Sequence, residues 1–167
     1  MKKYELTEET VTVYGKTLYR IRAVRDFGSV KTGEFGGYIE KEENLSHFGN
    51  AWVFGNAWVF GNAKVYDDAW VCGDAKVYGD AWVSGNAEVF NTRHFFVQGP
   101  IGSRDGYVTF YRTKDDTVEV RCGCFSGSLQ KFVDRVEETH GGSRYEKEYK
   151  LAAELAKVCI RLEGESR

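Results

Sequence analysis

The sequence predicts a mainly β chain in which a short parallel β-helix follows a β-hairpin and precedes a small α+β module. The main observation is a six-residue unit that recurs seven times between Gly49 and Phe90. Apolar residues alternate before it, and two amphipathic helical patterns follow it. We therefore expect an N-terminal hairpin and first coil in residues 1–48, the repeat in residues 49–90, and a hairpin with two helices in residues 91–167.

The repeated units read GNAWVF, GNAWVF, GNAKVY, DDAWVC, GDAKVY, GDAWVS and GNAEVF. Each contains a Val in one register and an Ala in another. A β-branched residue suits the inner face of a strand, and Ala is small enough for a crowded corner. Gly with Asn or Asp tolerates the left-handed backbone of a sharp turn. A helix is excluded, since each Gly in its interior would cost about 1 kcal/mol.

This pattern resembles the hexapeptide-repeat, left-handed β-helix family, in which three hexapeptides form one triangular coil. The resemblance implies a turn of three units, inward-facing Val, and homotrimers that bind ligands between subunits. Residues 18 apart would then stack at about 4.8 Å, and the corner Asn and Asp residues would form ladders. The expected outer stacks include Trp52 with Trp70, Trp58 with Lys76, and Lys64 with Trp82.

The outer positions on either side of each Val are mostly aromatic. A soluble monomer rarely exposes a contiguous aromatic patch of more than roughly a few hundred Å². Either another subunit or another part of the chain covers these rings, or some of them form a stacking platform for a ligand base or sugar. Nearby Arg side chains would complete a pocket for a phosphorylated, base-containing ligand. The candidate ligand-binding residues are Trp52, Trp58, Trp70, Trp82, Tyr66, Tyr78, Arg20, Arg22 and Arg93.

Catalytic and metal sites have weaker support in the sequence. Many proteins of the resembled family transfer acyl groups with a His as general base, but the seven units contain no His. His47 and His94, on either side of the repeat, are the candidates for that role. Cys122-Gly-Cys124 is a lone pair of thiols without further ligands at zinc spacing. We expect neither a metal nor a cofactor.

The formal net charge of −2 implies no general affinity for nucleic acids or membrane surfaces. The sequence shows no signal peptide and no apolar stretch of transmembrane length. Its four Cys are too scattered for a disulfide framework. A reducing cytoplasm is therefore the expected compartment.

The N-terminal flank predicts a hairpin over Val11–Ala23 with its turn at Gly15-Lys16. Tyr19, Ile21 and Ala23 should share one face, opposite Leu18, Arg20 and Arg22. Ile39 and Leu45 are one repeat length apart, which indicates an irregular first coil. The longer step from Leu45 to Val53 implies a two-residue insertion.

The C-terminal flank predicts a connector over 91–105 and an antiparallel pair formed by Tyr107–Tyr111 and Val118–Cys124. Amphipathic patterns predict helices over Ser128–His140 and Tyr145–Leu162. In the second helix, the expected buried face contains Tyr149, Ala152, Leu155, Ala156 and Cys159.

These observations favour a homotrimeric, non-enzymatic protein that binds a small molecule through aromatic surfaces between subunits. The regular repeats and the Cys-Gly-Cys-Phe segment look like small proteins of phages and bacteria. That resemblance suggests a phage-type sponge that sequesters a nucleotide-derived immune signal in the host cytoplasm. The alternatives are a hexapeptide-repeat acyl- or acetyltransferase and a structural or assembly adaptor.

Overall fold

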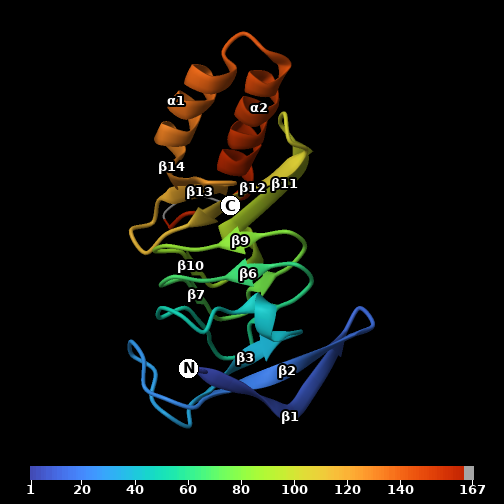
Figure 1. The fold of residues 1–167 in the computed structure, drawn as a ribbon, viewed down its shortest axis with the longest axis vertical. Coiled ribbons are helices and arrows are strands. Elements are labelled where there is room, and N and C mark those ends of the chain that lie inside the picture. The colour runs from blue at the N-terminus through green and yellow to red at the C-terminus, as the bar shows by residue number, and fades with distance from the viewer. Residues whose placement is uncertain (164–167) are drawn as a thin grey trace. The chain divides into compact units, whose positions relative to one another are not determined.

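The computed structural model of the chain describes residues 1–163. The fold is mainly β, with two helices at the C-terminal end (Figure 1). The chain divides into two compact units, residues 1–92 and 93–167. Each unit has its own sheets and is described separately below.

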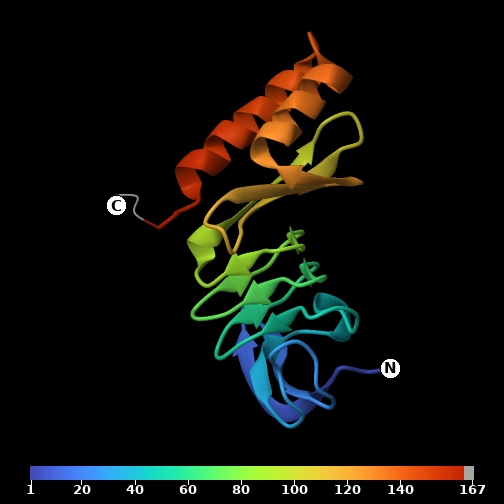
Figure 2. The ribbon, with the colours of Figure 1, turned by 90° about the vertical axis from the view of Figure 1, so that its left-hand side faces the viewer.

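The hexapeptides form seven two-residue strands in the first unit: β4 Trp52–Val53, β5 Trp58–Val59, β6 Lys64–Val65, β7 Trp70–Val71, β8 Lys76–Val77, β9 Trp82–Val83 and β10 Glu88–Val89. Strands three units apart in the sequence pair in parallel and lie one above another (Figure 2). They form the columns β4-β7-β10, β5-β8 and β6-β9. The predicted stacking, in which Trp52 lies beside Trp70 and Trp58 beside Lys76, is therefore confirmed.

The invariant residues of the repeat form its interior. All seven Ala side chains are fully buried, and the seven Val side chains are 0–1% exposed. Burial of one Val side chain contributes about 1.5–3 kcal/mol. The prediction that Val and Ala face inward is confirmed, so contacts with other molecules must come from the outer and corner positions.

The corners depend on left-handed backbone and on side-chain ladders. Gly49 has φ +68°, and Asp67, which takes the place of Gly in the fourth unit, has φ +59°. The Asn50 side-chain amide donates to Asp68 Oδ1 at 3.0 Å. The Asn62 amide donates in the same way to Asp80 at another corner, at 3.1 Å. These bonds confirm the predicted ladder at two of the corners.

Two glycines at equivalent corners provide a matched test of this geometry. Gly49 and Gly55 both have positive φ, but a Cβ on Gly49 would collide with the backbone of Asp67, whereas a Cβ on Gly55 meets nothing within 4 Å. Gly55→Ala should cost about 1–2 kcal/mol through backbone strain alone. Gly49→Ala should cost about 1–3 kcal/mol more, because the neighbouring coil must move. Urea unfolding of both variants measures the difference; equal losses would contradict the clash.

Before the repeat, β1 Tyr4–Val13, β2 Lys16–Ala23 and β3 Phe35–Ile39 form an antiparallel meander. This meander continues into the repeat, because β3 pairs in parallel with β5, Ile39 beside Val59. A short 3₁₀ helix, η1 Glu42–Asn44, follows, and Leu45 then bridges to Val65. The step from Leu45 to Val65 is two positions longer than the step between paired Val residues of the repeat. This difference confirms the predicted first coil and its two-residue insertion.

The hairpin differs from the prediction in its turn and its length. The turn residues are Tyr14-Gly15, and the strands extend back to Tyr4. Leu18 and Ile21 are both fully buried, although strict alternation would separate them. The pairing of β1 with β2 is irregular between Leu6 and Thr10, where β1 has two extra residues. Leu18 packs in a buried cluster with Val13, Tyr38 and Phe60 that does not include Ile21, so both faces of β2 are covered.

The second unit contains a four-stranded antiparallel sheet with two helices on one face (Figure 1). Its strands are β11 Phe95–Ile101, β12 Gly106–Arg112, β13 Val118–Cys122 and β14 Phe125–Ser128, and η2 Thr92–His94 precedes them. The predicted connector over 91–105 is therefore wrong in part, since β11 pairs with β12. The strand expected to reach Cys124 ends at Cys122, because a turn there leads into β14.

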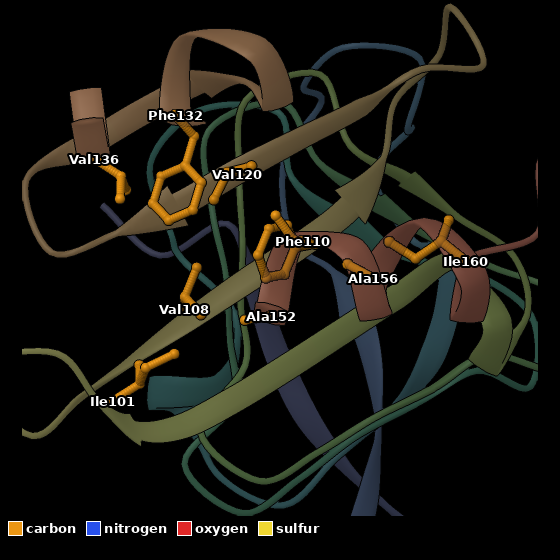
Figure 3. Close-up of a cluster of buried hydrophobic side chains, with 10 residues drawn as sticks. Ile101, Val108, Phe110, Val120, Phe132, Val136, Ala152, Ala156 and Ile160 are labelled. Carbon is orange, nitrogen blue, oxygen red and sulfur yellow. The ribbon is translucent and has the colours of Figure 1, made fainter. Parts of the chain in front are cut away.

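The two predicted helices are present as α1 Leu129–His140 and α2 Arg144–Cys159. The hydroxyls of Ser128 and Ser143 cap them by accepting bonds from backbone N–H groups. Their apolar faces pack on the sheet around Phe110 and Phe132, whose rings are 5.8 Å apart and nearly perpendicular (Figure 3). Within residues 1–163, no helix is long and apolar enough to cross a membrane.

The buried face of α2 differs from the expectation. Ala152, Ala153 and Ala156 are buried, whereas Leu155 is 47% exposed, so its placement in the core was wrong. The smallest side chains lie closest to the sheet because they allow the helix to approach it. Leu151 and Val158 are exposed with Leu155 along the outer side of the helix.

Candidate functional site

A row of two aromatic side chains with a cation at each end crosses one sheet of the first unit. Arg20 on β2 is paired with Tyr38 on β3, Tyr38 with Trp58 on β5, and Trp58 with Lys76 on β8. Directly paired residues of neighbouring strands point to the same face of a sheet. We call these four residues the cation–aromatic row.

The Arg20 end of the row is held by hydrogen bonds. The Arg20 guanidinium lies 5.0 Å from the ring centre of Phe35 and 5.9 Å from that of Tyr38. It donates to both oxygens of Glu9, at 3.0 and 3.2 Å. The Tyr38 hydroxyl also donates to Glu9, at 2.8 Å. The hydrogen bond from Tyr38 and the charge of Arg20 lower the pKa of Glu9, so this carboxylate stays ionised and fixes the guanidinium.

The Lys76 end is more open. Lys76 is exposed, and its Nζ lies 4.6 Å from the ring centre of the half-buried Trp58. A second pair of this kind occurs on another column, where Lys64 Nζ lies 5.2 Å from the ring centre of Trp82. Such contacts are worth about 0.5–1 kcal/mol at exposed sites. An indole face beside an ammonium group can accept a planar ligand that carries a negative charge.

Lys64 and Lys76 were absent from the predicted set of ligand-binding residues. Each takes the position that Trp has in other units, and each is three units away from a Trp. The signal was therefore present in the sequence, since a turn of three units already places these cations beside indole rings.

Trp52 does not belong to an exposed surface, which corrects the expectation for this residue. It is only 1% exposed, because Tyr4 and Phe27 contact it edge-on with ring centres 6.1 and 5.2 Å away. The N-terminal part of the chain thus covers the start of the repeat. The outer rings could be covered by another subunit or by another part of the same chain, and Trp52 is covered in the second way.

The remaining predicted residues are dispersed. Trp70 and Tyr66 are half-buried, and Phe54 contacts the Trp70 ring edge-on at 5.4 Å. Tyr78 is 47% exposed and stacks on Phe60. Arg22 forms an ion pair with Glu5, and Arg93 is an exposed residue of the second unit. Of the nine predicted residues, the structure brings Arg20 and Trp58 together in the row.

The two candidate catalytic histidines both contact structural elements of their own unit. His47 Nδ1 accepts a hydrogen bond from the backbone N–H of Lys3, and the His47 ring stacks on Tyr4. His94 is 4% exposed, and burial, together with the charge of Arg112, lowers its pKa to about 4. Burial of this kind suits a structural role more than exchange of protons with a bound substrate.

No protein-family model matches the sequence, and neither does any curated protein.

Proposed function

We propose that the protein is a non-enzymatic, homotrimeric binding protein whose residues 49–90 form a short left-handed β-helix. The parallel pairing of strands three units apart in β4–β10 supports this form of the repeat. Its ligand is a small nucleotide-like molecule with a planar ring and a negative charge. The cation–aromatic row is the observation that carries the proposal, because it places the half-buried ring of Trp58 beside a cation within one register of one sheet, with the buried Tyr38 behind it.

The chemistry of the row suits such a ligand. A base that stacks on an aromatic side chain gains about 1–3 kcal/mol, largely independent of its identity. Lys76 lies over the indole face and can move aside to contact a phosphate while the base occupies the ring. Arg20, which Glu9 already neutralises, contributes orientation more than charge. In this proposal, a phage-type protein sequesters a nucleotide-derived immune signal, and a trimer places rows of neighbouring copies close together.

Native mass spectrometry and calorimetry with cyclic nucleotides and ADP-ribose derivatives test the two parts of this proposal separately. A trimer that binds one of these ligands is the expected result. A monomer would contradict the assembly, and a trimer that binds none of these ligands would contradict the sequestration of a nucleotide-derived signal.

Two lysines allow a matched test of the site. Trp58→Ala should weaken binding at least about tenfold, since it removes the stacking surface. Lys76→Ala should weaken it about fivefold or more, since it removes the charge-assisted hydrogen bond to the phosphate. Lys64→Ala is the control, because it removes the equivalent cation–π contact on a different column. Equal losses in the two Lys variants would place the ligand elsewhere.

A further inference from the structure

The N-terminal residues form a cap on the first coil of the repeat. Lys3 and Tyr4 are both fully buried. The Tyr4 hydroxyl donates to the Leu45 carbonyl at 2.7 Å, and the Lys3 Nζ donates to the Ala51 carbonyl at 2.7 Å. Tyr4 and Phe27 contact Trp52, and Lys3 Nζ lies 4.8 Å from the Phe27 ring centre. We call Lys3, Tyr4 and Phe27 the N-terminal cap.

His47 joins this cap to the coil in one defined protonation state. The backbone N–H of Lys3 lies 3.1 Å from His47 Nδ1, and the Tyr4 ring stacks on the imidazole at 4.2 Å. A backbone N–H can only donate, so Nδ1 must be an unprotonated acceptor. The proton of the neutral ring is then on Nε2, 3.6 Å from a carboxylate oxygen of Glu42.

Most charged groups around His47 are positive. Lys2 and Lys3 approach from the N-terminal segment, and Arg25, after β2, donates to the His47 carbonyl at 3.4 Å. Glu42 on η1 is the acidic group that faces the ring. Lys3 itself interacts with Arg25 and Asp68; burial lowers its pKa to about 8, so it is mostly charged at neutral pH.

We propose that protonation of His47 releases the N-terminal cap and uncovers Trp52, which makes the cap an acid-sensitive device. Protonation of Nδ1 would turn this acceptor into a donor that points at the Lys3 N–H, so the hydrogen bond between them would be lost. It would also add a positive charge beside Lys2, Lys3 and Arg25. Glu42 opposes that charge, but it is already paired with Lys2 at 2.6 Å.

The direction of the pH dependence follows from the burial of the ring. Burial lowers the pKa of His47 below 6.5, and Glu42 only partly offsets this effect. At pH values between the pKa of His47 in the closed cap and 6.5, the imidazole binds more protons when the cap is released than when it is closed. The cap is therefore most stable above pH 6.5, and its stability falls as the pH decreases through this window.

NMR of the full chain between pH 7.5 and 4.5 tests the proposal. The signals of the Lys3 amide and the Trp52 indole should shift together as the pH is lowered. The midpoint of both shifts should equal the midpoint of the His47 titration, which lies below pH 6.5. The Trp82 indole and the amides of β12 should keep their positions at that midpoint. His47→Asn should abolish the shift, because an amide side chain can still accept a hydrogen bond but does not titrate.

A second variant keeps the test decisive if His47→Asn folds poorly. Glu42→Gln removes the opposing carboxylate from a partly exposed position and should move the midpoint to lower pH. The proposal is overturned if the Lys3 and Trp52 signals do not follow His47, if all signals change at one pH, or if either variant leaves the midpoint unchanged.

Discussion

Val71→Asp is expected to prevent the first unit from folding. Val71 is fully buried and belongs to the central strand of the β4-β7-β10 column, with Val53 on one side and Val89 on the other. A carboxylate at this position would have no partner in an interior built of Val and Ala. An unpaired buried charge costs more than about 4 kcal/mol, which approaches the total stability of a small unit.

Lys76→Asp is the matched control for this substitution. It places the same side chain in a strand of the same length, but at an exposed outer position. We expect a loss within about 1 kcal/mol, mostly from the contact with Trp58. Far-UV circular dichroism and urea unfolding separate the two outcomes. A folded, cooperative Val71→Asp protein would contradict the assignment of the Val column to the core.

Phe110→Ala should have the second largest effect, in the other unit. Phe110 is fully buried on β12 and contacts Phe96 and Phe132 at centroid distances of 6.0 and 5.8 Å. Its removal leaves a cavity between the sheet and the helices, and Phe→Ala substitutions at such sites cost about 3–5 kcal/mol.

Leu151→Ala provides the comparison within the same unit, since Leu151 on α2 is 63% exposed. Its expected cost is within about 0.5 kcal/mol. Hydrogen exchange of the β12 and β13 amides reports on this unit without interference from the repeat. Similar exchange rates in both variants would show that the Phe110 cluster does not stabilise the sheet.

The repeat was predictable because its information is local. Each hexapeptide carries its own inward Val, inward Ala and corner residues, so the period alone gives the stacking partners three units away. The two-residue insertion could be derived in the same way from the spacing of Ile39, Leu45 and Val53. Nothing about these features depends on the rest of the chain.

The cap over Trp52 was not predictable, because it depends on contacts between distant residues without a period. Lys3 bonds to Ala51 across 48 positions, and no local pattern marks Lys3 as a buried residue. Strand β11 was missed since Gly99-Pro100 reads as a turn. Strand β14 was missed because Phe125–Ser128 has a weak strand propensity.

Only part of the candidate site could be derived from sequence. Trp58 and Lys76 follow from the turn of three units, whereas the position of Arg20 beside Tyr38 depends on the pairing of β2 with β3. That pairing is irregular between Arg20 and Arg22, and pattern analysis does not locate such irregularities.

The placement of the two lysines also bears on how nearly identical strands find the correct partners during folding. The first two hexapeptides are identical, so their own sequences do not distinguish one neighbour from another. In the observed pairing, Lys64 lies opposite Trp82 and Lys76 opposite Trp58. A pairing between strands two units apart would set Lys64 against Lys76, and like charges directly opposite are destabilising. The two cations therefore disfavour a misaligned stack that Val and Ala alone would tolerate.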